Sequence, residues 1–426
     1  MHWPFHSGVL TAVRRTAPYV ANRLERWALG AFGRRIRGVP ARLRYRDVTI
    51  RDPDCPHPVA TVTIRRRRTL MDLLRHADVA FGEAYMAGDI EVDGDLVGLL
   101  EALFRLQDRA APLARVRAPA NSLAAARDNV HHHYDLGNDF YRLWLDDRLV
   151  YTCAYFPTPG ATLEEAQAAK MDLICGKLQL RPGEHVVEAG CGWGALALHM
   201  ARTHGVSVTA YNVSREQVRY ARDLAAQEGL SSRVAFVEDD YRAIRERADV
   251  FVSVGMAEHV GPTNYPELAR VIRRVLAGTG GRGLLHFIGR ARPRPLHPWI
   301  TKRIFPGAYP PTLVEAIAGM LEPANLAVLD VENLRLHYAK TLDHWRRRFV
   351  AVSEAVRRMF DAQFERAWRL YLSGAQAAFQ AGSLQLFQIV FAPASANATP
   401  WTRGRPILGS RFSPDAGGAG ESHGDL

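Results

Sequence analysis

The residues best suited to do chemistry lie in a glycine-rich segment, EAGCGWG, at positions 188–194. This segment ends an apolar run that begins at residue 185, and the helix-forming stretch LALHMARTHG follows it. Glycines at a strand-to-helix turn let the backbone approach a ligand closely, and the free N–H groups of the helix start favour a negative group. Gly190, Gly192 and Gly194 form G-x-G-x-G, whose third glycine comes earlier than in the dinucleotide pattern G-x-G-x-x-G. The spacing favours a compact zwitterionic ligand such as S-adenosylmethionine over NAD.

A second polar group follows a later apolar run. Asp239, Asp240 and Tyr241 come directly after the segment RVAFVE, residues 233–238. Carboxylates and a phenol at this place could grip a ribose or an adenine. A purely structural turn accounts for the same residues, and the pattern alone does not decide between the two.

Alternating strands and helices must position these residues. Apolar runs typical of buried strands cover residues 185–189, 206–211, 233–238, 248–254, 281–288 and 384–392. Helical patterns cover residues 196–205, 214–229, 341–359 and 361–381, with Ser214 as an N-cap. Short turns between strands and helices predict a doubly wound, mostly parallel α/β sheet. A Pro- and Gly-rich interruption at 290–323 precedes the last helices.

The chain divides into four segments. Residues 1–108 form a small α+β module, with a strand at 59–64 followed by a helix, a short strand and a helix. Residues 109–128 have the composition of a linker, and residues 129–392 hold the α/β domain. The tail, residues 393–426, is rich in Gly, Ser and Pro and is expected to be disordered.

The net charge of +11 is concentrated at one end of the chain. Residues 1–68 contain 15 arginines, no lysine and 4 acidic residues, so they carry the whole excess. Such a segment suits a polyanion, either nucleic acid or the phosphate surface of a membrane, although it is also compatible with a solvated basic surface. No uncharged apolar run is long enough to span a bilayer and no secretory leader is visible, so we expect a cytoplasmic protein.

Several ordered motifs together resemble one family, the S-adenosylmethionine-dependent cyclopropane fatty acid synthases. These motifs are NVHHHYDLGNDFYRLWLDDRLVYTCAYF (129–156), GCGWG (190–194), VSREQ (213–217), SVGMAEHVG (253–261), LLHFIG (284–289) and LHYAKTLDHW (336–345). The resemblance covers roughly residues 70–392. Because it includes the amino-terminal module, it implies the longer bacterial form that acts on phospholipids, with a class I methyltransferase Rossmann-like fold and a small amino-terminal lipid-associated domain.

The resemblance implies a reaction and a set of site residues. Family enzymes add a methylene unit from S-adenosylmethionine to the cis double bond of an unsaturated phospholipid acyl chain, with a bound bicarbonate ion as the base that allows the ring to close. The five bicarbonate positions fall on Cys153, Glu258, His286, Ile288 and Tyr338. The cofactor positions fall on Tyr151, Thr152, Glu188, Gly190, Cys191, Gly192, Trp193, Gly194, Asn212, Gln217, Asp240 and Tyr241.

One departure from the family pattern leaves the product open. Ala257 stands where a bulky aromatic residue is usual, so this position could widen the pocket and tune the product. The alternatives are a methylene- or methyl-branched chain, or a catalytically silent relative that binds lipid or cofactor. The apolar and cationic loop at 290–323 suits a lid that touches lipid headgroups.

The expected partners are membrane phospholipids with unsaturated acyl chains and the anionic inner face of the cell membrane, with which the protein would associate peripherally. A homodimer is compatible with the sequence. We expect no nucleic acid partner, because no Asn/Asp-Pro-Pro-Tyr/Phe signature or nucleic-acid module is present. We also expect no metal, because consecutive histidines such as His131, His132 and His133 point apart.

Overall fold

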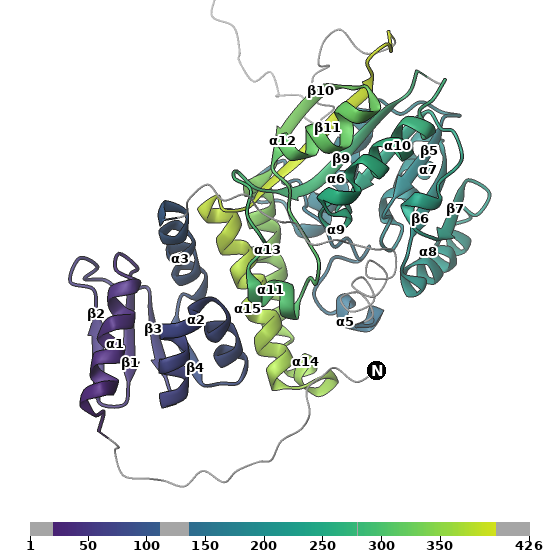
Figure 1. The fold of residues 1–426 in the computed structure, drawn as a ribbon. Helices are drawn as coiled ribbons and strands as arrows, with labels where there is room; N and C mark the ends of the chain where they lie inside the picture. Colours follow the sequence, from purple (N-terminus) through teal and green to yellow (C-terminus); the bar gives the residue numbers. More distant parts are fainter. Residues whose placement is uncertain (1–19, 111–135, 279, 398–426) are drawn as a thin grey trace, which may run out of the picture.

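The fold was analysed in a computed structural model that describes residues 20–110, 136–278 and 280–397. Two sheets, each with its own helices, lie on either side of a layer of long helices (Figure 1). The small sheet belongs to the amino-terminal module and the large sheet to the remainder of the described chain. The linker predicted at 109–128 and the tail predicted at 393–426 lie largely outside the described residues, so both stay predictions.

The amino-terminal module is a four-stranded sheet covered by helices. Its strands are β1 (Ala41–Tyr45), β2 (Val48–Arg51), β3 (Ala60–Ile64) and β4 (Ile90–Gly94), in the order β2-β1-β3-β4. Its helices are α1 (Arg23–Arg35), α2 (Arg67–Met86) and α3 (Leu96–Ala110). Strands β1 and β3 alternate buried and less buried residues, as expected for a sheet with one face against a core. The hairpin β1–β2 was not predicted from the sequence.

The large sheet has seven strands in the order β10-β11-β9-β8-β5-β6-β7. They are β5 (His185–Ala189), β6 (Ser207–Asn212), β7 (Val234–Glu238), β8 (Val250–Val254), β9 (Arg282–Gly289), β10 (Leu326–Asn333) and β11 (Gln385–Pro393). Strands β5 to β9 pair in parallel, and β11 is antiparallel to both of its neighbours. The predicted doubly wound Rossmann-like sheet is therefore confirmed, with one additional strand, β10.

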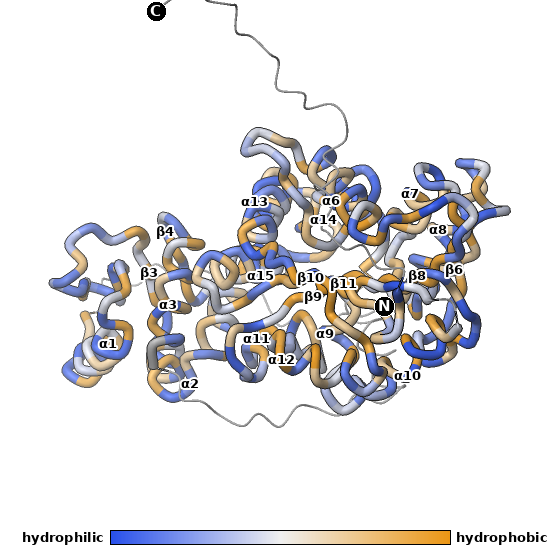
Figure 2. The backbone as a smooth tube through the Cα atoms, turned by 90° about the horizontal axis from the view of Figure 1, so that it is seen from above, coloured by the Kyte–Doolittle hydropathy of each residue, from blue (hydrophilic) through white to orange (hydrophobic). Residues whose placement is uncertain are grey.

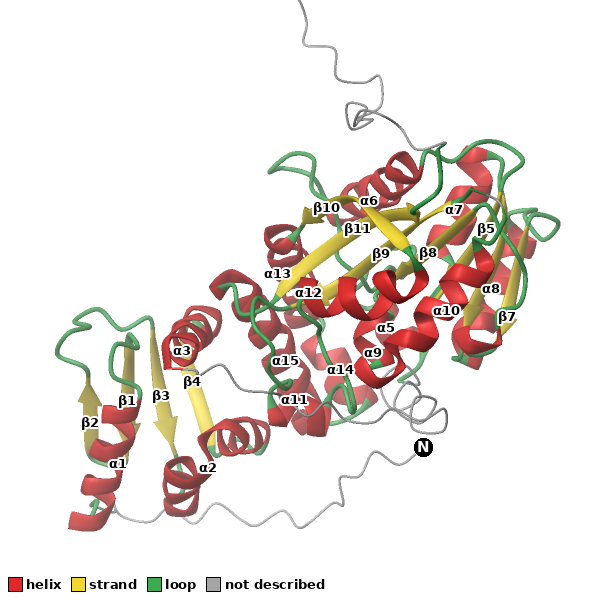
Figure 3. Cartoon of the chain, turned by 45° about the horizontal axis from the view of Figure 1, so that its top comes forward, coloured by secondary structure: helices red, strands yellow, loops and turns green. Residues whose placement is uncertain are grey.

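Helices cover both faces of this sheet (Figure 3). They are α5 (Asn138–Arg142), α6 (Leu163–Leu178), α7 (Ala195–His204), α8 (Arg215–Gln227), α9 (Ala257–Val260), α10 (Tyr265–Val275), α11 (Pro298–Arg303), α12 (Leu313–Ala316), α13 (Arg335–Ala351), α14 (Ser353–Met359) and α15 (Ala362–Ala381). The side chain of Ser214 accepts a hydrogen bond from the Gln217 backbone N–H, which confirms the predicted N-cap of α8.

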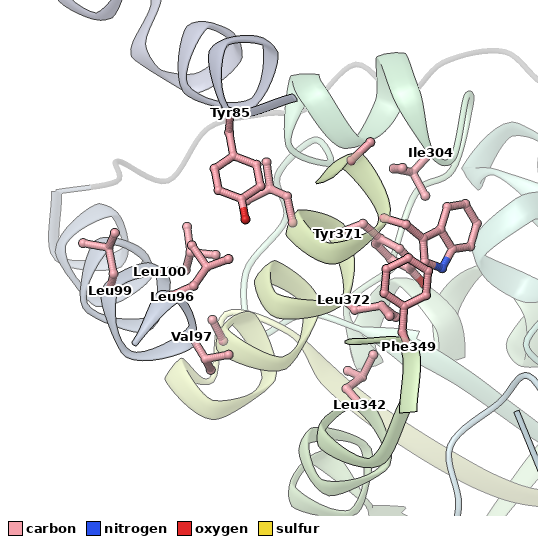
Figure 4. Packing of buried hydrophobic residues seen from close by; sticks show 14 of the residues in the cluster. Tyr85, Leu96, Val97, Leu99, Leu100, Ile304, Leu342, Phe349, Tyr371 and Leu372 are labelled. Carbon is pink, nitrogen blue, oxygen red and sulfur yellow. The ribbon is translucent and has the colours of Figure 1, made fainter. Parts of the chain in front are cut away.

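The two sheets share one hydrophobic core through the helix layer. A single cluster of buried residues extends from the module to α13 and α15, and Figure 4 shows labelled members of it from α3 on one side of α15 and Ile304 and Phe349 on the other. Hydrophobic residues gather where β9, β11 and α15 meet in the middle of the molecule (Figure 2). Polar contacts close the same junction: Arg303 pairs with Glu83 of α2 at 2.6 Å, and Arg366 donates to the backbone carbonyl of Ile90 at 2.8 Å. Among the helices described, none has the length and apolarity to cross a membrane.

Candidate active site

The glycine-rich turn joins β5 to α7 and opens onto the main cavity of the described structure, whose volume is about 930 Å³. Gly190, Gly192 and Gly194 have φ angles of 87°, 54° and 86°, which L side chains rarely adopt. A Cβ atom added at Gly192 would meet no atom within 4 Å, whereas one at Gly194 would lie 2.6 Å from Cζ of Phe236. Gly192 therefore leaves room on the cavity side, and Gly194 serves the packing of α7 against the sheet.

Most of the predicted site residues line this one cavity. They are Tyr151, Thr152, Glu188, Gly190, Cys191, Gly192, Trp193, Asn212, Gln217, Asp240, Tyr241, Glu258, Ile288 and Tyr338. Cys153, Gly194 and His286 lie behind the cavity wall. Segments more than 180 residues apart in the sequence thus come together at the carboxyl ends of the parallel strands, where ligands bind in open α/β sheets.

Asn212 and Gln217 brace the glycine-rich turn. The Asn212 amide donates to the carbonyl of Gly192 at 3.1 Å and to Oε1 of Gln217 at 2.7 Å. Its own oxygen accepts a hydrogen bond from the Ser214 backbone N–H at 3.2 Å. These contacts fix the end of β6 against the turn, while both side chains still face the cavity.

Asp240 and Tyr241 line the cavity just after the carboxyl end of β7. The Asp240 carboxylate accepts the Arg242 backbone N–H at 2.9 Å and pairs with the Arg242 guanidinium at 3.0 Å. The Tyr241 hydroxyl is buried and has no hydrogen-bond partner among the described residues. Burial raises the pKa of Tyr241 to about 12, so this hydroxyl stays protonated and can donate or accept. The structure thus combines the predicted turn with a polar group available to a ligand.

A buried lysine that the sequence analysis missed stands beneath the turn. Nζ of Lys170 on α6 donates to Oγ1 of Thr152 at 3.0 Å. Burial lowers the pKa of Lys170 to about 8, and Asp146, Cys153 and Glu188 oppose this decrease. Burial raises the pKa of Glu188 to about 8, and one of its carboxyl oxygens has no partner within the described residues. The signal in the sequence is the segment AAKM, in which Lys170 interrupts a helical face made mostly of small and apolar residues.

Glu258 lies at the centre of the second group of predicted residues. Its Oε1 accepts the backbone N–H of Ile288 at 2.5 Å, and its Oε2 has no partner among the described residues. Burial raises the pKa of Glu258 to about 7, so its carboxyl can hold or release a proton near neutral pH.

The orientation of His286 is fixed from behind the cavity wall. Lys177 donates to Oε1 of Gln388 at 2.7 Å, which directs the Gln388 amide N–H₂ toward Nδ1 of His286 at 3.1 Å. Burial lowers the pKa of His286, so the ring is neutral. Because Nδ1 accepts, we assign the proton to Nε2, and this atom has no partner among the described residues. His286 is therefore set as a hydrogen-bond donor.

Cys153 and Tyr338 complete the five predicted positions. The Cys153 thiol is fully buried and donates to the Ala154 carbonyl at 3.2 Å, and burial raises its pKa, so it stays a neutral thiol. The Tyr338 ring faces the cavity and packs against Phe379, with 4.5 Å between the ring centroids. His131, His132 and His133 lie outside the described residues.

The structure locates two features to which the sequence analysis gave a role, Ala257 and the 290–323 loop. Ala257 does not line the cavity, because its side chain points into the apolar core that α9 and α10 make with the sheet. The expected widening of the pocket at this position is therefore not found. In the 290–323 loop, Trp299, Ile304 and Tyr309 are buried, with Trp299 packed over Gly82 of α2. These three side chains do not face outward, but Trp299 lines the cavity together with Ile300 and Phe305, so contact of this loop with lipid stays a prediction.

The residues present suit S-adenosylmethionine. The open space at Gly192 can take an adenosyl-amino acid, the unpartnered oxygen of Glu188 suits an ammonium group, and the unpartnered Tyr241 hydroxyl lies on the same cavity. Together with the parallel sheet, they define the class of S-adenosylmethionine-dependent methyltransferases.

Comparison with known proteins gives the family. A family model described as mycolic acid cyclopropane synthetase matches residues 121–389, and this chain belongs to that family. A second model, for a domain of unknown function, matches residues 34–112.

Similar proteins extend over most of the chain. A probable fatty acid methyltransferase of Pseudomonas putida is 35% identical over 368 residues, which cover 82% of this chain and 91% of the relative. The cyclopropane-fatty-acyl-phospholipid synthase of Escherichia coli K12 is 41% identical over 260 residues, covering 61% and 66%. The structure of mycolic acid cyclopropane synthase CmaA1 with SAH and CTAB matches with a TM-score of 0.59 and 30% identity, covering 65% of this chain and 99% of that one.

Proposed function

We propose that this enzyme transfers a methylene group to the cis double bond of unsaturated acyl chains in phospholipids and forms a cyclopropane ring. The observation that carries the proposal is that one cavity connects the glycine-rich turn to Glu258 and then to apolar walls. In this reaction S-adenosylmethionine supplies the electrophilic methyl group. The phospholipid substrate has its support in the similarity to the Escherichia coli synthase.

The walls beyond Glu258 suit a hydrocarbon chain. They are formed by side chains of α13 and α15, namely Tyr338, Leu342, Leu370, Tyr371, Ala375, Ala378 and Phe379. The hydroxyls of Tyr151 and Tyr371 share a hydrogen bond of 2.8 Å, so neither directs an unpaired polar group at the chain. An apolar, water-excluding wall protects the cationic carbon that forms when an alkene takes up a methyl group.

The proton that leaves before ring closure needs a base. Glu258, with a pKa of about 7, is a group of this chain that can receive the proton from that base at neutral pH. Bicarbonate belongs to the proposal as the active-site base, and Cys153, Glu258, His286, Ile288 and Tyr338 would hold it. Nε2–H of His286 provides a donor for such an anion, while the Ile288 N–H already donates to Glu258.

Peripheral attachment to the anionic inner face of the cell membrane is also part of the proposal. Helix α1 and the residues before it expose Val20, Leu24 and Trp27, with 62%, 49% and 60% of their surfaces accessible. The exposed arginines Arg23 and Arg26 lie among them. Apolar side chains beside cations suit the interface of an anionic bilayer.

The test is transfer of label from methyl-labelled S-adenosylmethionine to vesicles. Phosphatidylglycerol with cis-unsaturated chains should be labelled, and its fully saturated counterpart should not. Label in the saturated lipid, or in neither lipid while SAH still binds, would contradict the proposal. A branched acyl chain is the second candidate product, because a probable fatty acid methyltransferase is similar to this chain over most of its length. A methylene-branched product would also carry the label, but hydrogenation would convert it to a methyl-branched chain.

A further inference from the structure

Arg290, immediately after β9, is a buried cation with no ion-pair partner within 4 Å among the described residues. Its residue surface is 6% exposed, and its Nε has no hydrogen-bond partner among the described residues. Burial and the neighbouring Arg294 lower the pKa of Arg290 to about 10, and more distant Tyr309, Asp108 and Glu315 only partly oppose this decrease, so the group is still charged at neutral pH. A buried charge without a partner is strongly unfavourable unless something else supplies the opposite charge.

The cavity is what Arg290 faces. Arg290 and Arg294 both line it, and the backbone N–H of Arg290 donates to the Pro311 carbonyl at 3.0 Å, which anchors the residue at the cavity wall. Arg294 pairs with Asp108 of α3 at 2.7 Å. The carboxylate of Asp108 is thus taken by Arg294, and the guanidinium of Arg290 is the cation left to a ligand.

Arg290 also lies between two apolar parts of the cavity. On one side, two residues before it, Ile288 belongs to the Glu258 site. On the other side, Arg294 reaches Asp108 of α3, and the cavity walls continue there with Leu100, Leu103 and Phe104 of α3 and with Leu73 and Phe81 of α2. A molecule that places an anion at Arg290 can therefore extend apolar chains in both directions.

We propose that Arg290 binds an oxyanion at the polar end of the acyl substrate, and that this oxyanion is the phosphodiester of a phospholipid whose two chains occupy the two apolar parts of the cavity. A free fatty acid offers the same chemistry through its carboxylate, but it has one chain and would leave the module side empty. This inference rests on the proposed function and names its substrate class.

The test compares Arg290→Met with wild type on three oleoyl substrates carried in micelles of a neutral detergent: dioleoylphosphatidylglycerol, oleate and uncharged dioleoylglycerol. The inference predicts that Arg290→Met lowers kcat/KM for the phospholipid by about tenfold or more, the range expected for loss of a charge-assisted hydrogen bond, and leaves turnover of dioleoylglycerol unchanged. A loss seen with oleate alone would assign the site to a carboxylate and overturn the phosphodiester assignment. Equal losses on all three substrates, or none, would overturn the anion site.

A stability measurement separates binding from structure. Without lipid, Arg290→Met should melt at a higher temperature than wild type, because it removes an uncompensated buried charge. Arg292→Met is the matched control, since Arg292 is exposed and does not line the cavity, and it should change neither property. A lower melting temperature for Arg290→Met would show a structural role and contradict the inference.

A measurement of ligand binding tests the anion site even if the enzyme does not catalyse the proposed reaction. Water-soluble dihexanoylphosphatidylglycerol, which carries the phosphodiester, should raise the melting temperature of wild type and Arg292→Met and not that of Arg290→Met. If wild type turns over none of the three substrates, this arm still decides the anion site, while the missing turnover counts against the proposed function alone. An equal shift in all three proteins would overturn the site.

Discussion

Replacing Glu258 with Gln tests two consequences of this buried carboxyl group, the pH dependence of stability and the transfer of a proton in catalysis. Burial raises the pKa of Glu258 from its ordinary value of 4.5 to about 7. Since the folded state then holds the proton more tightly than the unfolded chain, the protein loses stability as pH rises from about 4.5 to about 7. The full difference corresponds to about 3 kcal/mol. Glu258→Gln cannot ionise, so this part of the pH dependence disappears.

The expected result is a change in how the free energy of unfolding depends on pH, because the buried Gln amide also has an energetic cost that is the same at every pH. Gln can still accept the Ile288 N–H, but its N–H₂ replaces an oxygen that has no described partner, and such a buried donor costs roughly 1–3 kcal/mol at every pH. Urea unfolding of both proteins at pH 5 and pH 8.5 measures the difference. Relative to wild type, Glu258→Gln should be about 2.5 kcal/mol more favourable at pH 8.5 than at pH 5, because part of the full difference is already lost at pH 5.

Activity gives an independent readout of the same change. In the vesicle assay, kcat of Glu258→Gln should fall roughly 100- to 10,000-fold, the usual range for loss of a group that transfers a proton. Glu322→Gln is the control, because Glu322 is exposed and should keep wild-type behaviour in both assays. Parallel pH dependences of stability for wild type and Glu258→Gln would refute the reasoning about burial, and near-normal kcat would refute the catalytic role.

Three further changes test other parts of the site. Gln388→Leu removes the donor that sets the His286 tautomer, so kcat should fall by about tenfold while calorimetric affinity for SAH is unchanged; wild-type kcat would refute this. Ala257→Phe should destabilise the protein by roughly 1–3 kcal/mol through overpacking, without altering the ratio of products by mass spectrometry; a stable variant with a new product would restore a pocket role. Gly194→Ala should lower the melting temperature, because its Cβ would clash with Phe236 at a φ of 86°; an unchanged melting temperature would contradict this packing.

The sequence predicted the large sheet where strands are buried on both faces. β5 and β8 are continuous apolar runs with turns at both ends, and such runs are readable without knowing what covers them. β10 was missed because it lies at the edge of the sheet and most of its side chains are not buried. The hairpin β1–β2 was not predicted because arginines fill most of its exposed positions, and they obscure the strand alternation in ARLRY.

The sequence predicted the site residues that belong to contiguous motifs. It did not predict the residues that support them from other parts of the fold. The glycine-rich turn is a contiguous motif, and its geometry follows from its own residues. Lys170 and Gln388 come from a helix and a distant strand, and only the fold brings them to Thr152 and His286. For the same reason, the sequence pattern could not show that the Ala257 side chain points away from the cavity.

The most direct test of the central proposal is mass spectrometry of membrane lipids from a bacterium that lacks such an enzyme and expresses this chain. We expect unsaturated phospholipid chains to gain one methylene unit and the product to resist mild hydrogenation of double bonds, as a ring does. A gain that hydrogenation converts to a methyl-branched chain would contradict ring formation. Unchanged lipids from cells whose purified enzyme binds SAH would contradict methylene transfer to phospholipids altogether.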